Sequence, residues 1–402
     1  MKSHNPWHNE QGAVLVTGLI FIAILAVLGT SAYMTSSNEL KISSNYRAAR
    51  QAFYDADAGV NYAIARIEDD LTNGTLTLTN DEETVSYAAP TGFSFDTITT
   101  LTRQTGTSKY SFQSTGHSQN ARCTIEVFLL RDPTLEFGVF GEEQVDMKSN
   151  GHVYSYDSRS TPNPTPVDST GEGDVGSNEE VIVHNNTQID GNVGLGDDVA
   201  SIEAVLTQTG TPDIAGDVVD VDRVDTDPLG AIGGSLANDF VTYSASNDNA
   251  QAVPAIVGNA IDLGNGESMT LGKGNYYLTD INLHNGATLE IDASAGLVNI
   301  YLHGALDAKN GSTINLTGTP PDFTIYCDTT DSFVFKHGSV FKGTAYAPYA
   351  HIEMKNSSDV YGMIWGNTVG IKNSGEFYFD RALSEKWLSD TVSIVSWREI
   401  RG

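Results

Sequence analysis

The longest apolar run of the chain lies close to its N-terminus. Residues 12–32, GAVLVTGLIFIAILAVLGTSA, contain no charged side chain and follow the polar leader MKSHNPWHNEQ. At a rise of ~1.5 Å per residue, residues 13–32 would form a helix about 30 Å long, which matches the hydrocarbon thickness of a bilayer. The run therefore predicts a helix that can span a membrane.

A narrower apolar stripe extends this helix. Apolar side chains recur every three or four residues at Tyr46, Ala49, Phe53, Ala56, Val60, Ala63, Ile67 and Leu71. This spacing is typical of an amphipathic helix, and Asn73-Gly74 supplies a stop signal. We expect one long helix over residues 13–72, whose second part packs on a globular domain.

Alternating apolar and polar positions follow the helix. In residues 75–133 the alternation is clear at Tyr110 and Phe112 and again at Ile125 and Val127. It predicts a small antiparallel sheet against the helix. Cys123 falls in phase with Ile125, and Cys327 falls in phase with Ile325, so each thiol is expected in a core. Two separate buried thiols are favoured over one disulfide.

From about residue 134 the pattern changes to short apolar strands between tight turns. Turn marks fall at Asn285, Asn310, His337, Asn356 and Asn373, at intervals of 25, 27, 19 and 17 residues. Short strands at such intervals bury their apolar face by stacking on a copy of themselves, which predicts a parallel β-solenoid over residues 134–383. Antiparallel hairpins with tight turns at the same Asn-Gly pairs are the alternative.

Three segments interrupt or close this pattern. Residues 195–260 are acidic and read as an insertion that decorates the solenoid, with a short helix within 196–210. Residues 158–178 have the composition of a flexible loop. Residues 384–402 suggest a short helix and a strand, which we expect to cap the open end of the solenoid. The predicted fold class is mainly β with one long N-terminal helix.

The N-terminal pattern resembles a type IV prepilin, and in particular the N-terminal region of PilX-type pilus assembly proteins. The resemblance rests on a hydrophilic leader, residues 1–12, that ends in Gly12, followed by the small residue Ala13 and an uninterrupted apolar helix. It implies that a prepilin peptidase cuts after Gly12 and leaves Ala13 as a methylated N-terminus. It also implies partners: other minor pilins and pilus subunits, and the inner-membrane assembly platform.

One position departs from the pattern of major pilins. Their fifth mature residue is a glutamate that pairs with the N-terminal amine of a neighbouring subunit, and the residue at this position here is Thr17. A buried carboxylate without a partner is costly, so a subunit that lacks this neighbour gains nothing from carrying one. The resemblance therefore points to a minor pilin at or near the tip. The expected helix-packing residues are Val14, Leu15, Thr17, Leu19, Phe21, Leu25 and Leu28.

The second half of the chain resembles a β-solenoid domain found behind PilX-type N-termini, and more distantly bactofilin-type repeats. Tyr346-Ala347-Pro348 and Tyr361-Gly362 carry this resemblance. It supports the solenoid fold more than any particular role.

Charge and motifs narrow the function classes. The net charge of -29 argues against nucleic-acid binding, because phosphates would be repelled. The motifs of common hydrolases, nucleotide-binding proteins and metalloproteases are absent, and we expect neither an enzyme nor a required cofactor. The alternating carboxylates Asp220, Asp222, Asp225 and Asp227 are the best candidates for Ca²⁺ ligands, with a solvated acidic loop as the favoured alternative.

The leading hypothesis is a pilin-like structural subunit that contributes to pilus assembly. It would sit in the inner membrane with its C-terminal part in the periplasm, and then in a pilus or pseudopilus at the cell surface. The alternative is a solenoid adhesin for surfaces or glycans, carried by the pilin part. Its sugar-stacking candidates, expected mostly to pack between solenoid coils instead, are Tyr276, Tyr277, Tyr346, Tyr349 and Trp365. A third option is a membrane-anchored scaffold that is never processed.

Overall fold

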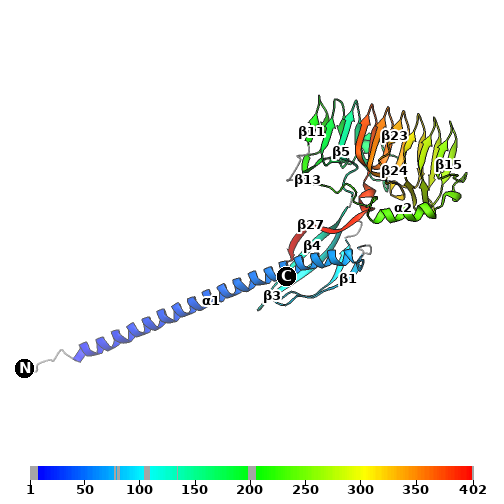
Figure 1. Cartoon of the computed structure of the whole chain (residues 1–402). Coiled ribbons are helices and arrows are strands. Elements are labelled where there is room, and N and C mark those ends of the chain that lie inside the picture. The colour runs from blue at the N-terminus through cyan, green and yellow to red at the C-terminus, as the bar shows by residue number, and fades with distance from the viewer. Residues whose placement is uncertain are drawn as a thin grey trace, which may run out of the picture. The chain divides into compact units, whose positions relative to one another are not determined.

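The computed structural model describes residues 8–76, 78, 82–103, 109–133, 135–197 and 205–400. The chain forms two compact units (Figure 1). Unit 1 contains Met1–Asp132 and Ser389–Gly402, and unit 2 contains Pro133–Leu388. Unit 2 is therefore inserted within the sequence of unit 1.

Unit 1 begins with a single helix, α1 (His8–Thr72), of 65 residues. It confirms the continuous helix expected over residues 13–72 and starts a few residues earlier. The strong apolar character of its first half and the stripe of its second half therefore belong to one element, as the pattern predicts.

The second half of α1 buries one face. The buried apolar residues along it are spaced three or four apart and are Ala48, Ala52, Ala56, Val60, Ala63, Ile67 and Leu71. The predicted stripe is wrong at its beginning, because Tyr46 and Ala49 are exposed.

A five-stranded sheet covers this buried face. Its strands are β1 (Glu82–Tyr87), β2 (Ile98–Arg103), β3 (Lys109–Ser118), β4 (Ala121–Pro133) and β27 (Leu388–Ile400), in that order across the sheet. The pairings β1–β2, β2–β3 and β3–β4 are antiparallel, as expected for residues 75–133. Cys123 is buried in this core.

Small residues let the helix and sheet approach closely. A Cβ added at Gly59 would clash with Ser114 Oγ, and one added at Gly116 would clash with backbone atoms of Ala52 and Ala56. Ser114 Oγ donates a hydrogen bond of 2.8 Å to the carbonyl oxygen of Ala56. The two glycines therefore set the distance between α1 and β3.

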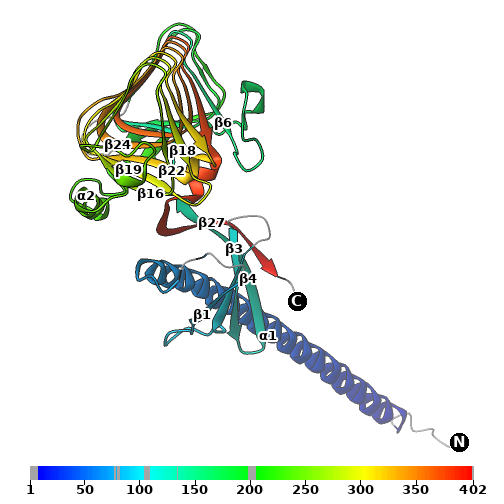
Figure 2. The same cartoon turned by 90° about the vertical axis from the view of Figure 1, so that its right-hand side faces the viewer.

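Unit 2 is a solenoid in which each coil contributes one strand to each of three faces, and Figure 2 shows the coils overlying one another. Strands on the same face pair in parallel, so the solenoid prediction is confirmed and the hairpin alternative is wrong.

We call the three faces A, B and C. Face A contains β14 (Ala260–Leu263), β17 (Asp280–Leu283), β20 (Leu306–Ala308), β23 (Phe333–Lys336), the last parts of β24 (Val340–Lys355), β25 (Asp359–Lys372) and β5 (Val139–Lys148), then β8 (Glu180–Val183) and β11 (Val205–Gln208). Face B contains β15 (Ser268–Leu271), β18 (Thr288–Asp292), β21 (Thr313–Thr317), the first parts of β24 and β25, β26 (Glu376–Asp380), β6 (His152–Tyr156), β9 (Gln188–Ile189) and β12 (Asp213–Ile214). Face C contains β16 (Gly274–Leu278), β19 (Val298–Leu302), β22 (Phe323–Cys327), the middle parts of β24 and β25, the first part of β5, β7 (Val175–Ser177), β10 (Val193–Asp197) and β13 (Val218–Asp222).

The register of face A reproduces the turn intervals read from the sequence. Ile281 pairs with Leu306, Leu306 with Phe333, Phe333 with Ile352 and Ile352 with Val369, which are offsets of 25, 27, 19 and 17 residues. Each apolar side chain in this row is almost completely buried. The spacing of these turn residues in the sequence therefore equals the number of residues in each successive coil.

The coils do not stack in the order of the sequence. β5 and β6, which come first along the chain, pair with β25 and β26, which come last. From β5 the chain builds outward to β13, and it then passes to the far end and builds back from β14. Trp365 and Phe140, stacked at 4.1 Å between ring centroids, mark the junction.

The returning segment, residues 223–259, contains α2 (Ser235–Ala245), which runs along the outside of face C (Figure 1). Phe240 and Tyr243 of α2 pack on Tyr301, with ring centroids 5.4 and 4.6 Å away. The predicted insertion at 195–260 is therefore too long, because β11, β12 and β13 belong to the coils. The short helix expected in 196–210 is wrong at Val205–Gln208, because these residues form the strand β11. Residues 198–204 lie outside the described residues.

The predicted C-terminal cap is also wrong. The chain makes a short 3-10 helix, η4 (Arg381–Glu385), and then enters β27, which belongs to the sheet of unit 1. Val392 of β27 is buried in the core of unit 1. A strand with alternating apolar residues can join any sheet that offers an edge, and the sequence did not show which edge was free.

Candidate functional site

The first half of α1 is an uncovered apolar surface, which we call the exposed helix segment, residues 13–46. Val14, Leu15 and Phe21 are 72%, 68% and 65% exposed. No charged side chain occurs between Ala13 and Asn38. Its most apolar window of 18 residues has a mean hydropathy of 2.6, and none of that window is buried.

The threonine hydroxyl groups of this segment are satisfied within the helix. Thr17 Oγ1 donates to the carbonyl oxygen of Ala13 at 2.8 Å, and Thr30 and Thr35 make the equivalent bonds to Ala26 and Ser31. A polar group without a partner would be costly in lipid or in a packed helix bundle. The three threonines of the segment therefore add no free hydroxyl donor to its apolar surface.

The structure brings the predicted packing residues together on this segment. The exposed fraction of each apolar member is between 59% and 72%. These members are Val14, Leu15, Leu19, Phe21, Leu25 and Leu28. Thr17 is exposed among them. The predicted processing junction, Gly12–Ala13, lies in the backbone of α1 near its beginning.

An aromatic and basic group marks the end of the exposed helix segment. Arg50 lies 5.8 Å from the ring centroids of both Tyr46 and Tyr54, and its Nη2 donates to Tyr54 Oη at 2.9 Å. Tyrosine with arginine is typical of a membrane–water boundary. The pattern of apolar positions alone does not predict this group, although Tyr46, Arg50 and Tyr54 are spaced at i, i+4 and i+8 in the sequence.

The predicted Ca²⁺ ligands are mostly separate. Asp220 and Asp225 are exposed, and the side chain of Asp222 lies outside the described residues. The Asp227 carboxylate accepts hydrogen bonds from Tyr346 Oη at 2.6 Å, from Tyr349 Oη at 3.2 Å and from two backbone amides. Among the described residues, no three His, Cys, Asp or Glu side chains gather in a metal-binding group. Ca²⁺ binding stays an untested prediction.

Most of the aromatic residues considered for sugar stacking pack inside unit 2. Tyr276, Tyr346 and Trp365 are fully buried, and Tyr277 and Tyr349 are half-buried. Burial and the Asp227 carboxylate raise the pKa of Tyr349 to about 12. These tyrosines and Trp365 hold the coils and the returning segment together, as was expected for most of them.

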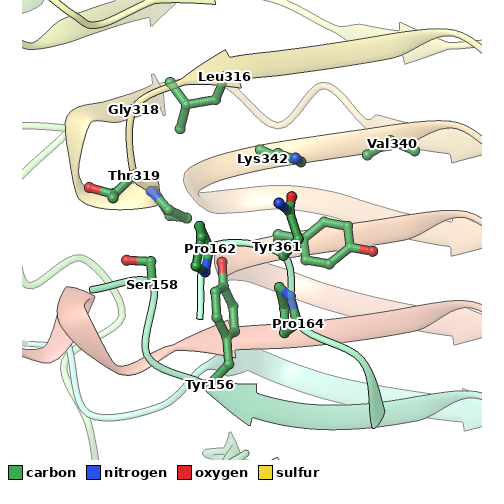
Figure 3. A pocket seen from close by; sticks show the side chains of 12 residues that line it. Tyr156, Ser158, Pro162, Pro164, Leu316, Gly318, Thr319, Val340, Lys342 and Tyr361 are labelled. Carbon is green, nitrogen blue, oxygen red and sulfur yellow. The ribbon is translucent and has the colours of Figure 1, made fainter. Parts of the chain in front are cut away.

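A different pocket opens on face B, and we call it the face-B pocket (Figure 3). It has a volume of about 450 Å³. Val340 and Lys342 of β24 and Tyr361 of β25 line one side. The other lining residues come from the end of β6 and the loop after it, and from the end of β21 and the turn after it; they are Tyr156, Ser158, Pro162, Asn163, Pro164, Leu316, Gly318, Thr319 and Pro320.

The loop after β6 is ordered where the composition predicted flexibility. Ser158 N donates to Asp380 Oδ1 at 3.0 Å, and Ser155 Oγ and Thr170 Oγ1 are hydrogen-bonded at 2.8 Å. A short 3-10 helix, η1 (Pro166–Asp168), and the strand β7 lie within residues 158–178. The expectation of a flexible loop there is corrected, because both of its ends are held by hydrogen bonds to the coils.

Comparison with known families identifies two parts of the chain. Residues 11–61 match the family described as PilX N-terminal, and residues 285–386 match a domain of unknown function, DUF7305. The first match covers the exposed helix segment and part of the buried half of α1. No curated protein matches the chain.

Three solved structures illustrate the structural likeness. An ice-binding protein from the Antarctic ascomycete Antarctomyces psychrotrophicus is 15% identical, with a TM-score of 0.36, over 60% of this chain and 94% of its own. The ice-binding protein 1 domain (DUF3494) of Shewanella frigidimarina is 14% identical, with a TM-score of 0.35, over 63% and 98%. The competence-associated pilin ComZ from Thermus thermophilus is 14% identical, with a TM-score of 0.28, over 88% and 97%. Such low scores say nothing of what this chain binds.

The N-terminal part of this chain is thus type IV pilin-like: it carries a PilX-type N-terminus on a long apolar helix that suits membrane anchoring.

Proposed function

We propose that this chain is a minor pilin-like subunit of a type IV pilus or a related pseudopilus, that it sits at or near the tip, and that it contributes to pilus assembly. The observation that carries the proposal is the exposed helix segment. It is long, uncharged from Ala13 to Asn38 and uncovered by any described part of the chain.

The segment needs an apolar environment in two successive states. Before assembly, the bilayer of the inner membrane supplies it, with the C-terminal units in the periplasm. After cleavage behind Gly12, the apolar helices of neighbouring pilins supply it inside the filament. A structural, non-catalytic role follows, with the prepilin peptidase and the membrane assembly platform as transient partners.

Thr17 supports a position at the tip. Its hydroxyl is bonded to the carbonyl oxygen of Ala13, so it offers no charge to the N-terminal amine of another subunit. A subunit in the shaft would leave that neighbouring amine without a carboxylate in an apolar core, which is costly. A subunit with no neighbour at that position avoids the cost.

The first test is the N-terminal mass of the protein from cells with an active prepilin peptidase. We expect a chain that starts at Ala13 and carries a methyl group. In a Gly12→Ala variant we expect the leader to be retained and the number of pili to fall. Gly18→Ala is the matched control, because a Cβ at Gly18 meets nothing within 4 Å on this chain. An intact Met1 start in the unaltered protein would reject the pilin pathway.

A second candidate function is a pilus-borne adhesin, and the face-B pocket favours it. Deletion of the gene separates the two. Loss of pili supports an assembly role, whereas intact pili with lost adhesion support the adhesin. Gold labelling of the solenoid on isolated pili then tests the tip, where label along the whole shaft would contradict the proposed position.

A further inference from the structure

The face-B pocket ends a row of stacked tyrosines. Tyr154, Tyr378 and Tyr361 occupy the same register position on successive coils. Their ring centroids are 5.3 Å apart between Tyr154 and Tyr378 and 4.8 Å apart between Tyr378 and Tyr361, the latter pair at an angle of 8°. Tyr154 and Tyr378 are buried, whereas Tyr361 is half-buried and lines the pocket. The pocket thus contains an aromatic ring that is held rigidly from behind.

The next position in this row is a lysine. Lys342 pairs with Tyr361 in the register, and its Nζ lies 5.7 Å from the centroid of the Tyr361 ring. Within the described part of the chain, Lys342 has no carboxylate within ion-pair distance. Other solenoid lysines do have one, among them Lys148, Lys336, Lys355 and Lys372. In so acidic a chain, a half-buried lysine left without a carboxylate at a pocket is available to a ligand.

Two turns of similar sequence lie at the pocket: one contributes Thr319 and Pro320 to its lining, and the other directly follows the lining residue Pro164. Thr165-Pro166-Val167-Asp168 follows Pro164, and Thr319-Pro320-Pro321-Asp322 follows Gly318. In both turns the Asp Oδ2 accepts hydrogen bonds from the Thr backbone amide and from Thr Oγ1, at distances of 2.6–2.8 Å. Proline and these bonds restrict both turns, so little order has to be imposed when a ligand binds.

We propose that the face-B pocket binds an acidic saccharide, whose pyranose ring packs against Tyr361 and the prolines and whose carboxylate pairs with Lys342. The pocket volume lies within the range of about 300–1,000 Å³ that is typical of small-ligand sites. An aromatic ring with rigid apolar neighbours suits the C–H face of a sugar, and Asn163 and Thr319 add polar groups for its hydroxyls. A carboxylate on the ligand would give Lys342 the charge-assisted bond that it lacks in this chain.

Because the chain carries a large negative charge, binding of an acidic ligand at this pocket should depend on Lys342. Asp359 and Glu376 lie on the same face, two register positions from the tyrosine row. Repulsion from more distant carboxylates is screened over about 8 Å at physiological salt, so the local ammonium group dominates for a ligand in contact with it. The other described residues that line the pocket are uncharged, so without Lys342 an acidic ligand would meet no positive charge in it.

The experiment measures binding to the full chain in detergent by isothermal titration calorimetry. The probes are tetragalacturonate with its methyl ester, and sialyllactose with lactose, so that each acidic probe has a neutral counterpart. We expect at least one acidic probe to bind about tenfold more tightly than its counterpart. Lys342→Gln should remove this preference, and Lys273→Gln is the matched control because Lys273 is an exposed solenoid lysine outside the pocket.

The outcomes separate the parts of the proposal. Tyr361→Leu should weaken the acidic and the neutral probe of a pair together, since it removes the ring but keeps Lys342. Equal binding of acidic and neutral probes would overturn the acidic preference. An equal loss in Lys342→Gln and Lys273→Gln would show general charge attraction and would overturn the site. Melting temperatures of all variants verify that the solenoid is folded. The result does not depend on processing at Gly12 or on pilus assembly.

Discussion

In unit 1 the apolar side chains of residues 13–46 face outward, whereas in unit 2 most apolar side chains of each coil are buried between neighbouring coils. The difference lies in how each apolar surface is covered. A solenoid coil finds its partner in the same chain, because a coil of similar shape lies directly against it. The exposed helix segment has no such partner among the described residues.

This contrast separates two roles. The fold of unit 2 is complete by itself, and its surface is free to recognise a ligand. Unit 1 has a closed core only around the second half of α1, and its first half requires a membrane or other subunits. Assembly is therefore expected to depend on unit 1, and recognition on unit 2.

The largest effect is expected from Trp365→Ala, which removes a side chain from the core of unit 2 and should lower the free energy of unfolding of the solenoid. Trp365 is fully buried, stacks on Phe140, and donates from Nε1 to the carbonyl oxygen of Thr226 at 3.1 Å. Removing such a side chain costs about 3–5 kcal/mol of unfolding free energy. Urea unfolding of the full chain should show this loss in the solenoid transition. Trp397→Ala, at a residue 57% exposed in unit 1, is the control and should cost no more than about 0.5 kcal/mol. Similar losses in both would contradict the prediction.

An intermediate effect is expected from Gly116→Ala, which should disturb the second half of α1 and leave the first half unchanged. The new Cβ would clash with the backbone of Ala52 and Ala56, and such overpacking costs about 1–3 kcal/mol. Amide hydrogen exchange in β3 and in the second half of α1 should accelerate. Gly29→Ala lies in the exposed helix segment, where a Cβ meets nothing within 4 Å, and should leave exchange in β3 unchanged. Faster exchange in β3 of Gly29→Ala would show that the halves are coupled.

The smallest effect is expected from Asp359→Asn on the surface of unit 2. Burial, and secondly the neighbouring Glu376, raise the pKa of Asp359 from 3.8 to about 6. The folded state therefore keeps a proton that the unfolded state has lost between these pH values, and stability falls as pH rises from about 4 to 6. Because Asp359 is only half-buried, we expect Asp359→Asn to stabilise unit 2 by only about 1 kcal/mol at pH 7. Below pH 4 the gain should disappear.

Urea titrations at pH 3.5, 5 and 7 measure this dependence. Asp220→Asn, at an exposed carboxylate on β13, serves as the control. A constant gain at all three pH values would mean that the substitution acts through packing and not through the proton.

Several features were readable from local patterns. The apolar run at residues 13–32, the stripe around Val60 and the turn marks from Asn285 to Asn373 each reflect one helix or one coil. The wrong expectations concern partners. Tyr46 fits the helical period but is exposed, and the strand at the C-terminus joins the sheet of unit 1 instead of capping the solenoid.

The sequence by itself determined the long helix, the alternating strands and the lengths of the coils, because each depends on periodicity over a few residues. Only the tertiary structure decided that β5 pairs with β25, that β27 joins β4 rather than capping the solenoid, and that Lys342, Tyr361 and the loop at Pro162 meet in one pocket. Apolar coils and strand edges of similar shape can pair in many orders, and the chain resolves this choice only when all of them are packed together.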